Sequence, residues 1–202
     1  MELIHDVIDV LKGLSIIIAS IVAIIGINSW SRETRWKKKH EISHNSVLVF
    51  YKLREAIRRI RNPFISAGEL NSVKKKYNLD QGQYDDKNRL VYYHRIECEE
   101  AIINEFRSQK HAFMAVFGKE KEKYFEGMLR IISRVGNAAH AYDMYKQSIR
   151  SGSDQTDISQ RQKELSKQEK ILWENYIEED PILQEIDAII DQVEKDCIRY
   201  IR

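Results

Sequence analysis

The hydrophobic pattern of the chain is dominated by one apolar run, residues 13–31, with the sequence GLSIIIASIVAIIGINSWS. A helix of this length rises 1.5 Å per residue and spans about 28 Å, close to the roughly 30 Å of a bilayer's hydrocarbon core. Because lipid offers no hydrogen-bond partners to backbone N–H and C=O groups, only a helix satisfies such a backbone inside a bilayer. The pattern therefore predicts a transmembrane helix.

The residues around the run argue against a cleaved signal peptide. A signal peptide begins with basic residues, whereas Glu2, Asp6 and Asp9 precede this run and only Lys12 opposes them. No small-x-small cleavage site separates the run from a soluble-looking start, because residues 28–30 lead directly into a basic segment. We expect an uncleaved membrane anchor.

The segment after the run is basic and sets the expected orientation. Its cationic residues are Arg32, Arg35, Lys37, Lys38 and Lys39. Residues 31–110 as a whole carry 18 Lys and Arg against 11 Asp and Glu, whereas residues 111–202 carry 14 against 17. Since cytoplasmic flanks of membrane helices are enriched in Lys and Arg, this asymmetry predicts the orientation of a single-pass membrane protein. Its N-terminus is expected outside and its C-terminal domain in the cytoplasm.

Downstream of the run, apolar residues recur every three or four positions, the spacing of amphipathic helices. Asn62-Pro63 ends the first pattern, because the residue before a proline disfavours the helical conformation. Asp180-Pro181 offers an N-cap followed by proline at the first helical position, where a final helix begins. The earlier patterns cover residues 31–61, 86–116, 119–150 and 158–178. Because residues 31–61 contain no Gly or Pro, we expect the anchor and the first downstream helix to be continuous.

These elements predict an all-α protein, in which an N-terminal single-pass transmembrane helix continues into a cytoplasmic bundle of about four to five helices. Residues 1–31 are expected to form an extracytoplasmic tip and the membrane helix, and residues 32–202 the bundle. Residues 63–86 form the longest stretch without a helical pattern, and a connection of that length is often functional. Residues 151–157, SGSDQTD, are the clearest linker.

Two neighbouring faces of the membrane helix differ in character when residues are projected at 100° per residue. One face would line a pore if several copies packed together, and consists of Asp6, Asp9, Gly13, Ile16, Ser20 and Ile27. The face beside it carries small residues that permit close helix packing in lipid, namely Ser15, Ala19, Ala23 and Gly26. Acidic rings followed by isoleucine constrictions are expected of a hydrophobically gated cation path. Alternatively, the acids stay in water and the small residues are ordinary membrane-helix composition.

A basic, tyrosine-bearing cluster lies within the irregular stretch. Candidate contacts for a polyanionic ligand are Arg58, Lys74, Lys75, Lys76 and Tyr77, since such side chains neutralise phosphates and stack on bases. The alternative is an ordinary solvated loop or short helix. The basic residues of the preceding helix indicate a solvated or lipid-facing surface, and they are Lys52, Arg54, Arg58, Arg59 and Arg61.

Enzyme motifs are absent from the sequence, which has no Gly-rich phosphate loop, nucleophile elbow, HExxH or zinc-type spacing. His94 and Glu97 share a helix face, as do His140 and Asp143. We interpret each as a local hydrogen-bonded pair, because a helical metal site needs further ligands. We expect no catalysis and no cofactor.

Two cysteines occur, Cys98 and Cys197, and both lie in helical patterns without CxxC spacing. This arrangement indicates buried free thiols in a reducing compartment.

The layout of the whole chain, with a membrane helix that leads into a helical bundle, resembles that of small bacterial antiphage effectors. The stretches YKLR at residues 51–54 and RNPFISAGE at residues 61–69 read like a family signature. The resemblance is to the membrane effector of the Hailong defence system. It implies an oligomeric ion channel held or released by a nucleotide oligomer, which a partner nucleotidyltransferase makes.

Two functions follow as hypotheses. The first is a homo-oligomeric membrane effector, whose N-terminal helices form a gated ion-conducting pore under control of the helical domain in antiphage defence. The alternative is a non-conducting, membrane-anchored helical scaffold that recruits a regulatory protein partner.

Overall fold

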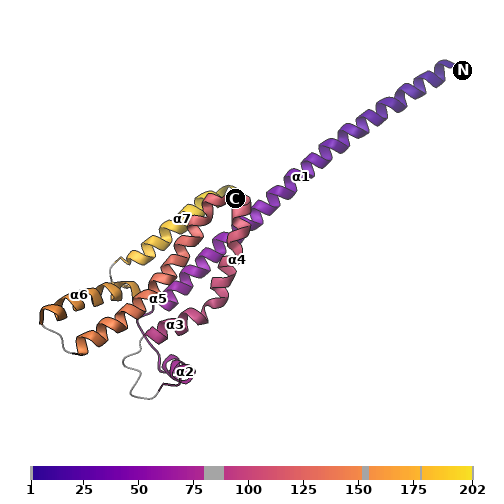
Figure 1. The fold of residues 1–202 in the computed structure, drawn as a ribbon. Helices are drawn as coiled ribbons and strands as arrows, with labels where there is room; N and C mark the ends of the chain where they lie inside the picture. The colour runs from indigo at the N-terminus through magenta and orange to yellow at the C-terminus, as the bar shows by residue number, and fades with distance from the viewer. Residues whose placement is uncertain (1, 80–88, 152–154, 178, 202) are drawn as a thin grey trace.

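The computed structural model describes residues 2–79, 89–151, 155–177 and 179–201, and the side chains of all of these except residues 2–11 and 155–157. Across these ranges the fold consists of helices and loops and contains no strand (Figure 1). The helices are α1 (Glu2–Ile60), α2 (Ala67–Tyr77), α3 (Arg89–Cys98), α4 (Glu100–Phe117), the 3₁₀ turn η2 (Lys119–Lys121), α5 (Glu122–Arg150), α6 (Gln155–Leu172) and α7 (Pro181–Ile201). The prediction of an all-helical protein is confirmed.

Helix α1 is one uninterrupted helix of 59 residues. Its N-terminal half extends alone out of the molecule, and its C-terminal part is enclosed by the other helices (Figure 1). Within the enclosed part, Phe50, Leu53 and Ile57 are fully buried. The predicted continuity of anchor and first bundle helix is therefore confirmed. The helix ends at Ile60, one residue before the predicted end.

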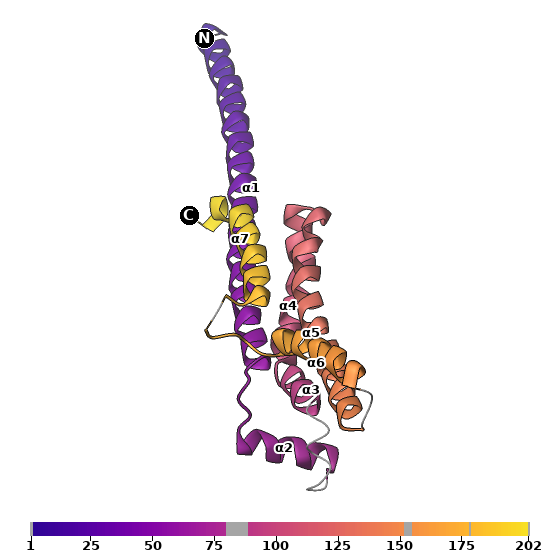
Figure 2. The same cartoon turned by 90° about the vertical axis from the view of Figure 1, so that its left-hand side faces the viewer.

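The main core forms where α4, α5 and α7 surround the C-terminal part of α1 (Figure 2). Three phenylalanines meet at its centre, one each from α1, α4 and α5: Phe50, Phe106 and Phe125. Their ring centroids lie 4.8–4.9 Å apart, and Phe50 meets both partners edge to face. Such aromatic pairs contribute about 0.5–1.5 kcal/mol each beyond the area they bury. The packing of α1 thus depends on contacts with helices distant in sequence.

A second, smaller cluster joins the end of α1 to α3, α5 and α6. Here the indole N–H of Trp173 donates to the hydroxyl of Tyr92, at 2.7 Å. Burial raises the pKa of the Tyr92 hydroxyl to about 12, although the Trp173 hydrogen bond opposes the shift. The Tyr92 hydroxyl is therefore neutral and available as an acceptor.

The stretch predicted to be irregular contains helix α2, so that prediction is wrong for residues 67–77. Ser66 caps the helix, because its hydroxyl accepts a hydrogen bond from the Glu69 N–H at 3.1 Å. Asn78 ends it in the left-handed conformation, with a φ of 50°. Ser66 and Glu69 have the spacing of a capping box, a local signal that predicts a helix start here. Residues 80–88 lie outside the described part of the chain.

Two further helix boundaries differ from the prediction. Glu99 leaves the helical conformation with φ −95° and ψ 7°, so the predicted helix over residues 86–116 is two helices, α3 and α4. The helix predicted to reach residue 178 ends at Leu172 instead. Its last carbonyl groups are hydrogen-bonded by a side chain of α1's C-terminal loop, described below. The predicted break near Gly118 is confirmed, and its φ of 101° favours glycine.

Candidate membrane segment and its junction with the bundle

The N-terminal half of α1 has no covering element in the described chain. Every side chain from Lys12 to Trp30 is exposed, and Ile16, Val22 and Ile27 are each more than 60% exposed. Within the described residues, α1 is the one helix long and apolar enough to cross a membrane, with a mean hydropathy of 2.0 over 18 residues. Such a large apolar surface marks a site that contacts a membrane or a protein.

The predicted pore-lining face lies on this exposed segment. Gly13, Ile16, Ser20 and Ile27 follow one side of a continuous helix, as the projection requires. The Ser20 hydroxyl donates a hydrogen bond of 2.8 Å to the carbonyl of Ile16, one turn earlier. This bond satisfies the hydroxyl within its own helix. The side chains of Asp6 and Asp9, which the same prediction places at the outer mouth, lie outside the described residues.

The predicted helix-packing face is equally uncovered. Ser15, Ala19, Ala23 and Gly26 are all exposed. A methyl group built on Gly26 would meet nothing within 4 Å, and the same holds for Gly13. The bundle therefore leaves both faces available for lipid or another helix.

Helix α1 enters the bundle beside the C-terminal turn of α7. Trp36 stacks on His40 with ring centroids 5.4 Å apart. The Nδ1 atom of His40 lies 2.5 Å from the carbonyl oxygen of Tyr200, and Lys39 lies over the Tyr200 ring at 5.1 Å. Because a carbonyl oxygen only accepts, His40 must carry a proton on Nδ1. These contacts tie the entry point of α1 to the end of α7.

Arg61 contradicts the predicted solvated or lipid-facing surface, because its side chain is fully buried. Its guanidinium forms a bidentate ion pair with Asp180, at 2.9 and 3.0 Å. It also donates to the carbonyl groups of Lys170, Ile171 and Trp173 at the end of α6. The carbonyls that a helix end leaves without partners are thus satisfied by one side chain.

Asp180 is also the N-cap of α7, as the sequence predicts. One of its oxygens accepts the N–H groups of Ile182 and Leu183, at 2.8 and 3.1 Å. Burial alone would raise the pKa of the Asp180 carboxyl, but the bonds from Arg61 and from backbone N–H groups hold that pKa below its ordinary value. The carboxylate therefore stays ionised and joins α1, α6 and α7.

The remaining basic residues of this part of α1 are also paired. Arg54 pairs with Asp187 of α7 at 2.7 Å, and Arg58 pairs with the buried carboxylate of Glu174 at 2.8 Å. Arg59 and Lys52 pair with carboxylates at the start and in the middle of α4. The predicted solvated surface therefore holds for Lys52 and Arg59, which are exposed, and is wrong for the buried Arg61. Arg54 and Arg58 are half-buried.

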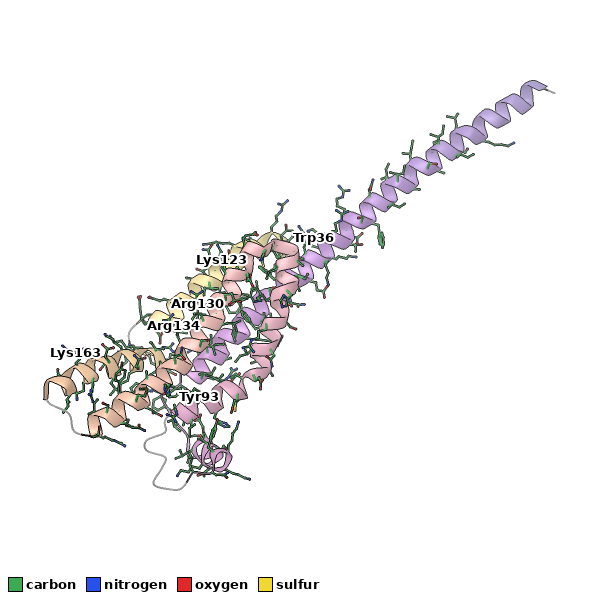
Figure 3. All side chains as sticks on the ribbon, viewed as in Figure 1. Trp36, Tyr93, Lys123, Arg130, Arg134 and Lys163 are labelled. Atoms are coloured by element: carbon green, nitrogen blue, oxygen red, sulfur yellow. The ribbon has the colours of Figure 1, made fainter. Side chains whose placement is uncertain are left out.

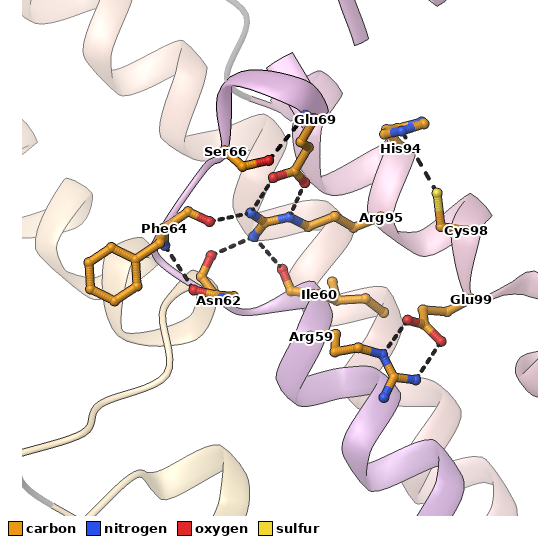
Figure 4. Close-up of a pocket in the computed structure, with 10 residues that line it drawn as sticks. All are labelled: Arg59, Ile60, Asn62, Phe64, Ser66, Glu69, His94, Arg95, Cys98 and Glu99. Atoms are coloured by element: carbon orange, nitrogen blue, oxygen red, sulfur yellow. Dashed lines mark hydrogen bonds and ion pairs between the residues drawn. The ribbon is translucent and has the colours of Figure 1, made fainter. Parts of the chain in front are cut away.

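A second buried arginine, Arg95 of α3, holds the chain that leaves α1. It donates to the backbone carbonyls of Ile60, Asn62 and Phe64 and pairs with Glu69, the acid of α2's first turn (Figure 4). Burial tends to raise the pKa of the Glu69 carboxyl, but the hydrogen bonds and charge of Arg95 outweigh this effect, so the pKa lies below its ordinary value. Arg95 thereby fixes α2 against the end of α1.

A hollow of about 360 Å³ opens beside this arginine (Figure 4). Its polar groups, apart from a histidine and a cysteine of α3, are already engaged: Arg59 with Glu99, and Arg95 with Glu69. The lining residues are Arg59, Ile60, Asn62, Phe64, Ser66, Glu69, His94, Arg95, Cys98 and Glu99. The hollow is therefore a gap between satisfied ion pairs.

The predicted pair of His94 and Glu97 is not formed. His94 Nε2 lies 3.8 Å from the sulfur of Cys98, and Glu97 instead pairs with Lys76 of α2. The prediction of two buried thiols is half right, since Cys197 is buried and Cys98 is exposed. Burial raises the pKa of the Cys197 thiol to about 11.

The other histidine pair is also replaced by a different contact. The Asp143 carboxylate accepts the backbone N–H of Arg89 at 3.1 Å, and burial raises the pKa of the Asp143 carboxyl above its ordinary value. His140 is exposed. Within the described residues, no group of three or more His, Cys, Asp or Glu side chains could hold a metal ion.

The residues proposed for an anionic ligand are distributed over two elements. Lys74, Lys75, Lys76 and Tyr77 lie on α2, whereas Arg58 lies on α1. The Tyr77 hydroxyl is 3.5 Å from Glu97, the carboxylate that also pairs with Lys76. Arg58 is paired with Glu174 and Lys76 with Glu97. Because carboxylates already neutralise these two cations, they are poorly placed to bind a further anion. Lys75 is exposed at the surface of α2.

Comparison with known proteins returns no match: no family model, no curated protein and no solved structure matches this chain.

Proposed function

We propose that this is a membrane protein of the bacterial inner membrane, anchored by the N-terminal half of α1 with the bundle on the cytoplasmic side. The observation that carries the proposal is the exposure of every side chain in an apolar helical segment, Lys12 to Trp30, in an otherwise packed molecule. Burying these side chains in lipid removes apolar surface from water at about 25 cal/mol per Å². The basic residues that follow the segment support the orientation.

Several copies associate through the small-residue face and form a gated, ion-conducting pore. Ser15, Ala19, Ala23 and Gly26 permit close approach, and the adjacent face turns Ser20 and the isoleucines toward the central axis. The uninterrupted helix couples the bundle to this pore, so a change in bundle packing moves the membrane segment. Following the resemblance in layout, we assign the pore to antiphage defence, with an anionic ligand such as a nucleotide oligomer as the signal.

A non-conducting anchor is the second candidate, and one observation favours it. Because the Ser20 hydroxyl bonds to the Ile16 carbonyl, it needs no water-filled path to be satisfied. Ser20 is thus compatible with a helix surrounded by lipid. In this case the bundle serves as a scaffold that recruits a protein partner.

Conductance of the full-length protein in planar bilayers separates the two candidates. A pore gives ionic current that changes when Ser20 is replaced by Val, because the change makes the proposed conduit more apolar. The matched control is Ile18→Val, on the opposite side of the helix, which leaves the current unchanged. No current from any oligomer, or equal currents in both variants and the wild type, would reject the pore.

A helix replacement provides the corresponding test for the anchor. If the protein is only tethered, a variant in which residues 13–27 are exchanged for an unrelated apolar helix keeps its cellular activity. The readout is protection of a bacterial host against phage, measured as plaque counts. The mass of the detergent-solubilised protein adds a direct check, since a monomer is incompatible with a pore.

A further inference from the structure

Three segments distant in sequence meet at the end of the bundle from which α1 emerges. They are residues 36–40 of α1, residues 117–124 around η2, and residues 195–201 of α7 (Figure 2). The rings of Phe117 and Tyr200 lie 5.7 Å apart, and Lys121 pairs with Asp196 at 2.7 Å. We refer to this end as the exit face. These contacts hold its three segments together.

Exposed cations surround the exit face. Lys119, Lys123, Lys195 and Arg199 are exposed, and within the described chain none of them pairs with a carboxylate. Lys123 lies over the ring of Tyr124 at 5.3 Å. Figure 3 places Lys123 and Trp36 at this same end of the molecule.

The acids of the exit face are mostly engaged by other groups. Glu122 accepts from Lys110 at 3.2 Å, Glu194 accepts from the Tyr51 hydroxyl at 2.7 Å, and Asp196 pairs with Lys121. Glu120 is the exposed acid that remains. The exit face therefore presents an excess of positive charge that its own carboxylates do not neutralise.

Apolar side chains are exposed between these cations. Trp36 is 48% exposed, Ile198 45% and Ile201 36%. Tryptophan favours the level of lipid headgroups, where an aromatic ring meets both apolar and polar surroundings. The combination of basic and apolar side chains is typical of surfaces that rest on a membrane.

Along α1, the exit face lies close to the level expected for the lipid headgroups. The apolar run ends at Ser31, and residues 36–40 lie about 8–14 Å further along a helix that rises 1.5 Å per residue. The headgroup layer occupies about 5–8 Å on each side of the hydrocarbon core. Long basic side chains bridge the few ångströms that remain.

We infer that the exit face binds the headgroups of anionic phospholipids and holds the bundle against the membrane surface. The inference rests on the proposed membrane anchoring but requires no pore. Each basic residue near an anionic surface strengthens binding by about fivefold, and the attraction decays within a Debye length of about 8 Å at physiological salt. Four exposed cations are therefore sufficient to orient the bundle.

Hydrogen exchange of the full-length protein in vesicles tests the inference. The vesicles contain phosphatidylcholine alone or with about 30% phosphatidylglycerol as the anionic lipid. Amides in residues 117–124 and 195–201 should exchange about fivefold more slowly with the anionic lipid, and about 1 M salt should abolish the difference. Amides of α2, at the other end of the molecule, should not respond.

A charge-reversed variant provides the second arm. Lys119→Glu, Lys123→Glu and Lys195→Glu together should remove the effect of phosphatidylglycerol. The matched control reverses three exposed lysines elsewhere, Lys75→Glu, Lys163→Glu and Lys167→Glu, and should retain it.

The outcomes separate this inference from the proposed anchoring. If the chain is inserted but its exit face exchanges at the same rate in both kinds of vesicle, the inference alone is overturned. The inference alone is also overturned if both charge variants lose the effect of phosphatidylglycerol to the same extent. A chain that alkaline carbonate washes off both vesicles overturns the anchoring and the inference together. Because the salt arm uses the wild-type protein, the test does not depend on a variant that folds.

Discussion

Arg61 and Asp180 are 119 residues apart in sequence, yet they form a buried, bidentate ion pair with side chains 0% and 2% exposed. The pair lies where α1 ends, α6 ends and α7 begins. Both members of the pair make further bonds, since Arg61 also donates to carbonyl groups at the end of α6 and Asp180 also accepts from N–H groups of α7. The relative placement of the three helices therefore depends on this pair.

Replacing Asp180 by Ala should lower the free energy of unfolding of the bundle by about 3–5 kcal/mol, because Arg61 is left buried without a counter-charge. Urea denaturation followed by circular dichroism measures the effect. The matched control is Glu105→Ala, which removes an exposed partner of Lys52 and should cost less than about 1 kcal/mol. Equal losses in the two variants would contradict the role given to Arg61.

Arg95→Lys should loosen α2 without unfolding the main core. Lysine keeps the charge but lacks the planar fork that reaches three carbonyls and Glu69 together. We expect a loss of about 2 kcal/mol and faster hydrogen exchange in residues 67–77. Arg130→Lys, an exposed position on α5, serves as the control. Unchanged exchange in α2 would show that Arg95 does not hold it.

Asp143→Asn should stabilise the protein at neutral pH. Burial raises the pKa of this carboxyl in the folded state, so ionisation costs folding free energy as pH rises from its unfolded pKa of about 4 through the folded value. Asparagine keeps an acceptor for the Arg89 N–H without the charge. The gain in melting temperature at pH 7 should vanish near pH 3, where the carboxyl is protonated in both the folded and the unfolded state, as thermal melts at both pH values would show.

Asp187→Asn is the opposite control, since it removes the negative charge that pairs with the Arg54 guanidinium and should destabilise the protein at pH 7. A melting temperature that falls in both variants would contradict the reasoning on Asp143.

The two thiols should differ in reactivity. Cys98 is exposed, whereas burial raises the pKa of the Cys197 thiol to about 11, which suppresses the reactive thiolate. Maleimide should therefore modify one thiol per native chain and both in denaturant, as intact mass spectrometry would report. Cys98→Ser should show no native modification. Rapid modification of Cys197 in the native state would mean that the C-terminal turn of α7 opens readily.

Features set by neighbouring residues were predictable from the sequence. The apolar run, the end of α1 before Pro63 and the start of α7 at Asp180 each have a local physical cause, and the structure has each of them. The start of α2 also has a local signal, the spacing of Ser66 and Glu69, which the basic composition of the segment obscured.

Features set by distant partners were not predictable. Arg61 and Arg95 resemble any surface arginines in sequence, and only the packing of α6, α7 and α2 around the end of α1 buries them. The partners of Lys76 and His94 likewise depend on how α2 lies along α3. The exposed apolar segment of α1 posed no such difficulty, because its character comes from its own composition.

The length of α1 has a mechanical consequence. Between Lys39, which lies over the Tyr200 ring of α7, and Gly13, 26 residues of helix form an arm of about 39 Å. If the bundle tilts by about 5°, simple geometry moves the far end of this arm by about 3 Å, roughly the width of a small ion. A continuous helix of this length would act as a lever, and a rearrangement too small to disturb the core would be amplified at the N-terminal end of α1.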